Sequence, residues 1–586
     1  MDSLDYGSLD EGRDCNYWQW DPTLRRHARR LTDDADWPWV DDRLDDWGRI
    51  VGETVADNAD VANANPPTLD TYDRRGERAN DVTYHPAQHE NDRLTYEFGV
   101  VADAFTAPDD REDAPGIAYS LTAQALLAYT DIGFACPVSM TAGAALVLDT
   151  YADHSPQPDV LRDYFDRLVA RDHGDAIEGA MFLTEKQGGS DVGRNETTAV
   201  EADDGTYRLA GEKWFCSNVD AEGTLVLARR EDAPEGTDGL SLFLVPHTLP
   251  DGSLNDQTYR RLKDKLGTET VPTGEVELTG ATGYLVGEPE NGFRQMTTML
   301  NFERVANAAG AVGVTGRALL EAKTHAADRA AFGRALDGHP LMRRDLAEWT
   351  ARYEGMVAVT LEAAHALDAA ERDEGDADAR ALMRGLVPIA KYRTGRLAVD
   401  ATSYAMEIRG GDGYVADYVT ERLLRDAQVL PIWEGPSNVL ALDLLRALER
   451  EGAADALLAR VDENLDAARD SRLADLVSRV SSERDGLRES MAAVAGADRD
   501  RAQHDAKALA DYAYDVVAAS ALLALAADRL AAGDAREAAV ARLFVRDAFG
   551  DDRPSPERAL ALDHFESIAH YAELSPDALK MSRTVE

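Results

Sequence analysis

The chain has 586 residues, 44% of them hydrophobic, and carries 108 acidic against 62 basic side chains, a net charge of −46. Nucleic-acid binding depends largely on neutralising phosphates with Lys and Arg, so this charge disfavours a nucleic-acid partner. No run of eighteen uncharged apolar residues occurs, so we expect no membrane-spanning helix.

The acids are spread along the whole chain, and 54 of the 62 basic residues are Arg. Self-repulsion of this size would destabilise an ordinary fold at low salt. At about 1 M salt the Debye length falls to about 3 Å and removes that repulsion. We interpret the composition as halophilic, an acidic proteome in a salty cytoplasm. The alternative is an acidic surface for one partner, which would gather the acids in one patch.

The N-terminal segment, MDSLDYGSLDEGRD, is acidic and polar. A secretory signal begins with basic residues and continues with an apolar core, so we expect a cytoplasmic protein. Cys15, Cys136 and Cys216 are odd in number and far apart. This spacing predicts neither a disulfide framework nor a zinc site, and we expect no metal.

Residues 1–178 are predicted to form an α-helical domain with long connections. Within it, residues 63–86 carry Pro, Gly and Asp turn signals and are predicted to form an ordered loop. Residues 120–151 are apolar at helical spacing, which predicts buried helix interrupted at Cys136 and Pro137.

The pattern then changes. Residues 179–286 contain short apolar runs separated by turn residues, typical of a domain of antiparallel strands. Residues 287–447 return to helical patterns that exceed 20 residues, which predicts an antiparallel four-helix bundle. Residues 448–586 are Ala-rich and predict a helical extension. The predicted fold is therefore α+β and multidomain.

The segment FLTEKQGGSDVG joins the first two predicted domains. Gly188 and Gly189 allow the backbone to approach a ligand closely. Thr184 and Ser190 supply hydroxyl groups, and the exposed N–H groups of such a loop bind anions. The alternative is a plain turn.

The segment GEKWFCSN places adjacent aromatic residues beside Ser217 and Asn218. One interpretation is a strand whose aromatic side chains pack in the core. The other is an aromatic wall with a hydroxyl donor, suited to a planar ring.

Two further segments follow long helical patterns. In RAAFG, Arg329 could meet a phosphate and Phe332 could cover a ring, or the segment is a helix end with a basic last turn. In IRGGDGY, the glycines form a helix cap and turn, or they allow close approach to a cofactor.

Glu434 lies in the apolar run LPIWEGPSNVL. A carboxyl group that Trp433 and Ile432 shield from water has a raised pKa, which suits a general base. Ser437 or Asn438 is predicted to cap the helix that follows.

A second acid, Glu303, precedes Arg304 on the first long helix of the predicted bundle. It is either a helix-surface acid paired with an Arg or a carboxylate that faces a pocket.

Taken together and in this order, several strings resemble the acyl-CoA dehydrogenase family of flavoproteins, most closely its AidB branch, the adaptive response to alkylation. The strings are NANPP, YHPA, CPVSMT, MFLTEKQGGSDV, KWFCS, RLKDKLG, IRGGDGY and PIWEGPSN. The collinear resemblance runs from about residue 60 to about residue 450. It implies a helical domain, a middle antiparallel β-barrel, a long-helix bundle, bound FAD and a homotetramer.

By motif position, the resemblance implies that Glu434 is the base that removes the α-proton of an acyl thioester. Glu303 stands where isovaleryl- and long-chain-type relatives carry this base, and Arg304 matches an Arg close to the active site. Arg329 and Phe332 would reach the FAD of a neighbouring subunit. The implied cofactor-binding residues are Met181, Leu183, Thr184, Gly189, Ser190, Phe215, Cys216, Ser217, Arg329, Phe332, Gly410, Gly411, Trp433, Gly435, Ser437 and Asn438.

The resemblance therefore implies an oxidoreductase that takes an acyl-CoA-like substrate and passes electrons to an electron-transfer flavoprotein. Trp433, in place of the usual Tyr, with the large Met181 and Phe182, predicts a narrow pocket and weak or atypical activity. The alternatives are an AidB-like, DNA-associated protector against alkylation and a non-catalytic flavoprotein scaffold. Residues 451–586 contain 27 acids and 17 bases, so the extension has no basic enrichment.

Overall fold

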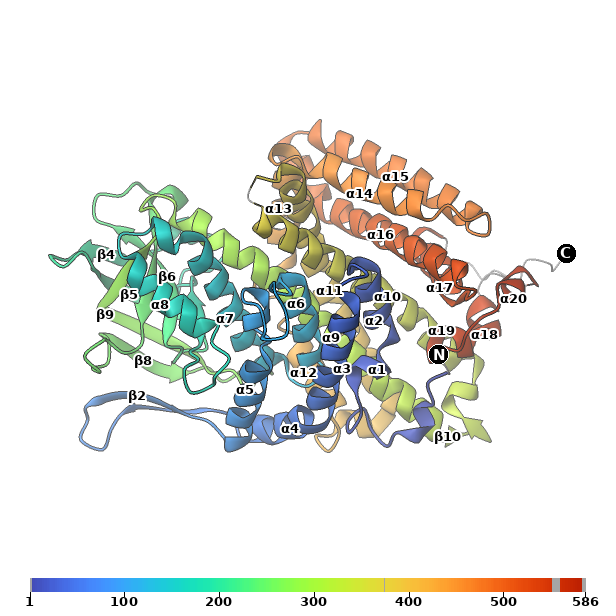
Figure 1. The fold of residues 1–586 in the computed structure, drawn as a ribbon, viewed down its shortest axis with the longest axis horizontal. Helices are drawn as coiled ribbons and strands as arrows, with labels where there is room; N and C mark the ends of the chain where they lie inside the picture. The colour runs from blue at the N-terminus through green and yellow to red at the C-terminus, as the bar shows by residue number, and fades with distance from the viewer. Residues whose placement is uncertain (1–2, 374, 551–558, 582–586) are drawn as a thin grey trace. The chain divides into compact units, whose positions relative to one another are not determined.

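The computed structural model describes residues 3–373, 375–550 and 559–581 (Figure 1). The chain divides into two compact units. Unit 1 comprises Met1–Glu53, Ala128–Thr130 and Asn307–Glu586, and unit 2 comprises Thr54–Leu127 and Asp131–Ala306. Helix α9, Gly292–Asp328, runs from unit 2 into unit 1. The four domains expected from the sequence remain a prediction.

The helices of unit 2 precede its sheet in the chain. They are α4 Ala56–Ala64, α5 Pro86–Phe98, α6 Ile117–Leu127, α7 Ile132–Tyr151 and α8 Pro158–Leu168. The predicted interruption at Cys136 and Pro137 is wrong, because Pro137 lies inside α7. The interruption comes earlier, where the Asp131 side chain caps α7 by accepting from the Phe134 N–H at 3.1 Å. A proline this near the start of a helix removes only one backbone hydrogen bond.

The predicted loop over residues 63–86 instead contains a β-hairpin of β1, Thr68–Tyr72, and β2, Arg78–Thr83. Strand β8 of the sheet holds the hairpin in place. The Asn80 amide donates to the Gln257 carbonyl at 2.8 Å and accepts from the Tyr259 N–H at 3.1 Å. These partners lie far along the chain, so local turn signals could not indicate them.

The middle region forms the β-barrel that we expected. Five of its seven strands close a ring in which β6 pairs with β4, β4 with β5, β5 with β9, β9 with β7, and β7 with β6. Most pairs are antiparallel, but β6 pairs in parallel with β3 and β4. The strands are β3 Gly179–Phe182, β4 Thr198–Glu201, β5 Tyr207–Ser217, β6 Gly223–Arg230, β7 Leu240–Pro246, β8 Gln257–Leu262 and β9 Thr273–Val286.

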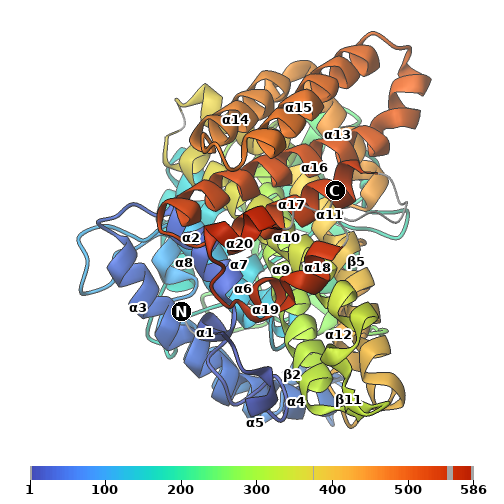
Figure 2. The same ribbon diagram turned by 90° about the vertical axis from the view of Figure 1, so that its right-hand side faces the viewer.

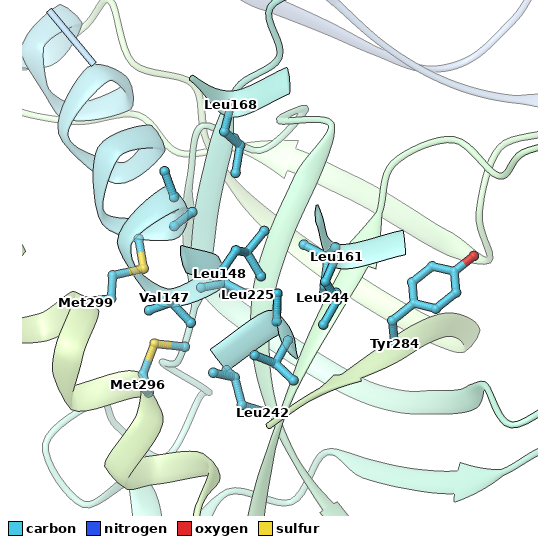
Figure 3. Packing of buried hydrophobic residues seen from close by; sticks show 14 of the residues in the cluster. Val147, Leu148, Leu161, Leu168, Leu225, Leu242, Leu244, Tyr284, Met296 and Met299 are labelled. Carbon is cyan, nitrogen blue, oxygen red and sulfur yellow. The ribbon is translucent and has the colours of Figure 1, made fainter. Parts of the chain in front are cut away.

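Alternation along the strands gives unit 2 two apolar cores. One fills the barrel and includes Phe182, Cys216 and Phe243. The other joins the outside of the barrel to α7, α8 and the start of α9, as Figure 3 shows with Leu148, Leu161, Leu225, Leu242 and Met296. Because α7 is covered on all sides, its lack of a polar face is that of a buried helix.

Among the residues of unit 1 that the structure describes, the only strands are the two-residue β10 Ala330–Ala331 and β11 Arg334–Ala335, and the other regular elements are helices. Its N-terminal helices are α1 Tyr17–Trp20, α2 Pro22–Leu31 and α3 Trp37–Ile50. Long helices follow as α10 Pro340–Arg372, α11 Ala377–Arg409, the shorter α12 Thr420–Ala427, and α13 Ser437–Arg450. The extension contains α14 Ala453–Ala467, α15 Ala474–Ala495, α16 Arg499–Ala531, α17 Arg536–Phe549, α18 Leu560–Asp563, α19 Phe565–His570 and α20 Pro576–Met581.

The extension packs on the rest of unit 1 through α16 and α17, which contact α10 (Figure 2). Buried ion pairs accompany the apolar contacts. Arg536 at the start of α17 pairs with Glu354 of α10 at 2.5 Å, and both side chains are almost fully buried. Arg26 of α2 pairs with Glu537 of α17. The extension is thus an integral part of unit 1.

Two helices are long and apolar enough to cross a membrane by length and composition alone. They are Ile132–His154 and Arg499–Ala531, and 83% and 78% of their apolar windows are buried. Helices with this burial pattern also occur in the cores of soluble proteins. Among the described residues no group of His, Cys, Asp and Glu could hold a metal ion.

Candidate active site

The loop after β3 is held by a backbone hydrogen bond to β5 and by a close contact within the motif. The Thr184 carbonyl accepts from the Trp214 N–H of β5 at 2.9 Å, which joins the loop to the neighbouring segment. A Cβ on Gly189 would lie 2.4 Å from the Thr184 hydroxyl, so only glycine fits there. Gly188 adopts φ +133°, and Ser190 is exposed. The turn interpretation and the ligand interpretation both agree with this geometry.

A buried ion pair that we did not predict from the sequence lies beneath this loop. The fully buried Lys213 ammonium donates to Glu185 at 2.8 Å and to the Leu227 carbonyl at 2.9 Å. Glu185 also accepts from the Thr197 hydroxyl at 2.6 Å and from the Glu196 N–H at 2.7 Å. Burial raises the pKa of Glu185, but the Lys213 charge and these hydrogen bonds outweigh it and hold the pKa at about 2. One signal was available, since Lys is rare in this chain and Lys213 interrupts a strand pattern.

The aromatic pair in β5 does not pack in the core, so that interpretation is wrong. The register of β5 against β9 shifts between Lys213 and Cys216, as in a β-bulge. Because a bulge adds a residue to one strand, Trp214 and Phe215 both lie outside the barrel. Phe215 is 58% exposed. The Lys263 ammonium lies 3.6 Å from the centre of the Trp214 ring and 4.8 Å from that of Phe215.

The side chains around the pair are divided between the two faces of the barrel wall. Ser217 lies 3.2 Å from the Thr273 hydroxyl. Cys216 and Phe182 are buried in the barrel core, so only their backbones can meet a ligand, and Phe182 cannot narrow a pocket as predicted. Met181 and Leu183 are partly buried against the outer core.

The segment that carries Glu434 differs from the prediction in two respects. Ile432 is 66% exposed, so within this chain it does not shield Glu434 from water. Helix α13 begins at Ser437 with Pro436 at the N-cap, and no side chain caps it. Ser437 and Asn438 therefore lie in the first turn, because Pro436 takes the extended conformation that an N-cap requires.

Glu434 itself is half-buried, between the half-buried Trp433 and Gly435. Its φ is +55°, a left-handed conformation that few residues other than glycine adopt. Gly435 follows with φ +102°. Such outliers persist only where surrounding contacts hold them, and they gather at functional sites.

Glu303 is not a helix-surface acid, so that interpretation is wrong. Its side chain is 4% exposed, and one carboxylate oxygen accepts from the Ser139 hydroxyl of α7 at 3.0 Å. The other carboxylate oxygen faces Gly143, where an added Cβ would lie 3.1 Å from it. Arg304 is half-buried. The two candidate bases lie in different units, Glu303 in unit 2 and Glu434 in unit 1.

Arg329 does not form a basic last turn, since α9 ends at Asp328 and Arg329 enters the β10–β11 hairpin. Phe332 lies at the tip with φ +50° and is 98% exposed. An aromatic side chain on so small a hairpin has little within its own chain to cover it.

Gly410 caps α11 with φ +70°, which confirms the cap interpretation. The same glycines leave the backbone open, since a Cβ on Gly410 or Gly411 would meet nothing within 4 Å.

The predicted residues therefore form two groups. Unit 2 holds Met181, Leu183, Thr184, Gly189, Ser190, Phe215, Cys216, Ser217, Glu303 and Arg304. Unit 1 holds Arg329, Phe332, Gly410, Gly411, Trp433, Glu434, Gly435, Ser437 and Asn438.

In residues 448–550 and 559–578 of the extension, most arginines pair with neighbouring carboxylates, for example Arg484 with Asp485 at 3.0 Å and Arg542 with Asp475 at 2.8 Å. A phosphate would have to displace these carboxylates.

Comparisons with known proteins agree with this arrangement. Residues 9–175 match the adaptive response protein AidB N-terminal domain, residues 180–281 the acyl-CoA dehydrogenase middle domain, and residues 290–449 the acyl-CoA dehydrogenase C-terminal domain. The chain is 35% identical over 453 residues to acyl-CoA dehydrogenase family member 11 of Caenorhabditis elegans, covering 76% of this chain and 72% of that protein.

It is 34% identical over 437 residues to putative acyl-CoA dehydrogenase AidB of Escherichia coli, covering 72% of this chain and 76% of that protein. The crystal structure of Caenorhabditis elegans ACDH-11 in complex with C11-CoA superposes with a TM-score of 0.84 at 29% identity, covering 94% of each chain. This chain belongs to the acyl-CoA dehydrogenase family.

Proposed function

We propose that the protein is an FAD-dependent acyl-CoA dehydrogenase-like oxidoreductase. The observation that carries the proposal is Glu434, a half-buried carboxylate held in a left-handed conformation within the family's C-terminal domain. An acyl-CoA substrate is supported by the similar Caenorhabditis elegans structure, which is in complex with C11-CoA.

The residues present fit a flavin. Phe215 and Phe332 leave aromatic faces uncovered, and the glycines at 410 and 411 leave open backbone. The buried Nε1 of Trp433 has no hydrogen-bond partner within the described chain, so it can donate to a ligand. A structure with the same fold, an acyl-CoA dehydrogenase from Bacillus anthracis, is complexed with FAD.

In this mechanism the Glu434 carboxylate accepts the α-proton of the acyl thioester while the bond between the α- and β-carbons becomes double. When bound, FAD supplies the acceptor, at N5, for the hydride that leaves the β-carbon. Trp433, adjacent to Glu434 and half-buried, would limit water at the carboxylate, which favours proton transfer from a weak carbon acid. Phe215, Ser217 and Thr184 would orient the flavin ring, and Gly189 and Ser190 would lie near its phosphates.

Glu303 is the alternative base. Its side chain is 4% exposed, and the Ser139 hydroxyl donates to one of its carboxylate oxygens. Substituting each acid with Gln separates the two assignments, because only loss of the true base abolishes reduction of the flavin.

We propose a narrow substrate range, because Trp433 and Met181 are both large. An electron-transfer flavoprotein is the electron acceptor that the family chemistry favours. Anaerobic bleaching of the flavin band by acyl-CoAs of increasing chain length tests the function and its range together. Failure of every acyl-CoA to bleach a protein that holds FAD would favour a scaffold.

We further propose a homotetramer, in which neighbouring subunits cover large apolar side chains that unit 1 exposes. These are Phe332, Leu341, Tyr414 and Ile432. Light scattering at high salt measures the mass of the assembly, and a mass near the 63.8 kDa of one chain would contradict the proposal.

We propose that the protein works in a salty cytoplasm, since a net charge of −46 requires screening. The midpoint of thermal unfolding should rise steadily as KCl is raised from 0.1 M to 3 M. A midpoint independent of salt would argue against this adaptation.

The match to the AidB N-terminal domain keeps one second function open, association with DNA in protection against alkylation. The acidic extension and its paired arginines weigh against it. Gel retardation of duplex DNA at multimolar salt tests it, and a shift there would favour the protective function.

A further inference from the structure

Lys391 of α11 is a buried cation for which neither the sequence analysis nor the proposed mechanism gives a function. Its side chain is fully buried in unit 1. Its ammonium donates to the Trp433 carbonyl at 2.6 Å and to the Gly435 carbonyl at 2.7 Å. These two carbonyls belong to the residues on either side of Glu434. One ammonium therefore holds both neighbours of the proposed base.

A second contact on the same face of α11 fixes the distance between the helix and this segment. Gly395 lies one helical turn after Lys391, where residues four apart share a face. A Cβ on Gly395 would lie 3.2 Å from the Leu430 carbonyl, so the segment packs closely against the helix. Three residues after Leu430, the Trp433 carbonyl accepts the hydrogen bond from Lys391. The long helix α11 gives both contacts a rigid base.

The conformation of the segment explains why such a contact is needed. Glu434 and Gly435 have φ of +55° and +102° in succession. A left-handed glutamate is disfavoured and relaxes unless its surroundings hold it. Hydrogen bonds from a charged donor are stronger than those between neutral groups. Two such hydrogen bonds, from Lys391, hold the residues on either side of Glu434. The buried ammonium in turn needs the two carbonyl acceptors, because an unpaired buried charge is costly.

We propose that Lys391 is a positioning residue that fixes the backbone of Glu434 and so aims its carboxylate at the substrate. The inference rests on the proposed function of Glu434 as the base. It assigns Lys391 no contact with substrate or flavin. Misplacing a reacting group by about 1 Å costs on the order of 100-fold in rate, whereas binding of the rest of the substrate is unaffected.

Lys391→Met in the FAD-loaded full-length protein tests this. Rapid mixing with the acyl-CoA that bleaches the wild type should give a reduction rate at least tenfold lower, with the dissociation constant of the acyl-CoA within threefold of wild type. A wild-type reduction rate would overturn the inference. Lys323→Met is the matched control, because Lys323 is also buried in unit 1 but touches Tyr6 and Tyr571 instead. The flavin of Lys323→Met should be reduced at the wild-type rate.

Hydrogen exchange gives a readout that needs no activity. The backbone amides of residues 432–435 should exchange faster in Lys391→Met than in the wild type and in Lys323→Met. Unchanged exchange there would refute the inference, whereas a wild type that no acyl-CoA reduces would refute only the proposed function. If Lys391→Met does not fold, Lys391→Gln decides the matter, since the shorter, uncharged amide cannot replace both hydrogen bonds of the ammonium. A wild-type rate and wild-type exchange in Lys391→Gln would overturn the inference.

Discussion

Two lysine–glutamate ion pairs in unit 2 have the same N–O distance, but one pair is buried and the other is exposed to solvent. Lys213–Glu185 and Lys186–Glu212 both measure 2.8 Å. The first pair is 0% and 4% exposed, and the second is 54% and 29% exposed. Breaking a buried pair leaves an uncompensated charge out of water, whereas an exposed charge is readily solvated.

We therefore expect Lys213→Met to lower the free energy of unfolding by about 3–5 kcal/mol, because Glu185 stays buried without its cation. Lys186→Met should lower it by about 0–1 kcal/mol. The double variant Glu185→Gln, Lys213→Met should recover most of the loss, since the amide oxygen can still accept from Thr197 and no buried charge remains.

Urea denaturation at 2 M KCl, followed by tryptophan fluorescence and by circular dichroism, measures the three differences. Both probes must give the same transition before a single free energy is assigned. Equal losses of unfolding free energy in Lys213→Met and Lys186→Met would refute the claim that burial makes the first ion pair matter more. A double variant less stable than Lys213→Met alone would show that the other hydrogen bonds of Glu185 matter more than its charge.

Three further predictions concern other parts of the molecule. Burial, together with the charge of Glu222, raises the pKa of Glu178 to about 7. Between about pH 4.5 and 7 the native state therefore binds more protons than the unfolded state, so its stability falls as pH rises through that window. Glu178→Gln should therefore be more stable than the wild type by about 1–3 kcal/mol at pH 8 but not at pH 4, and a gain independent of pH in urea titrations would contradict this. Arg536→Met should destabilise unit 1 by about 3–5 kcal/mol and speed proteolysis within residues 565–581, because Arg536 binds both Glu354 and the Ser567 carbonyl. An unchanged rate of digestion would contradict this prediction. Phe332→Ala should speed FAD loss in gel filtration, because the ring is 98% exposed within its own chain and so is available to cover the cofactor. Equal retention of FAD would exclude Phe332 from the cofactor site.

Local patterns predicted the elements that local physics determines. Short apolar runs separated by turn residues between 179 and 286 indicated the barrel strands, and helical patterns of more than 20 residues indicated α9, α10 and α11. The interruption at Pro137 was placed wrongly, because a proline near a helix start is tolerated and the Asp131 cap is a stronger signal. The β1–β2 hairpin was missed because β8, more than 170 residues later, holds it.

The candidate site shows the same limit. Motif order identified Glu434 and the loop at Gly189, because these depend on residue type and spacing. The buried cations Lys213 and Lys391 were missed, because their acceptors include backbone carbonyls that are distant along the chain and carry no residue signature. Burial of Glu303 likewise depends on α7, which its own helix pattern does not reveal.

Anaerobic reduction of bound FAD by an acyl-CoA, compared among the wild type, Glu434→Gln and Glu303→Gln, tests the central claim most directly. We predict that the flavin band of the wild type and of Glu303→Gln bleaches, while that of Glu434→Gln persists because no other group accepts the α-proton. Bleaching by Glu434→Gln together with its loss in Glu303→Gln would contradict the assignment of the base. A flavin band that no acyl-CoA bleaches in the wild type would contradict the proposed function itself.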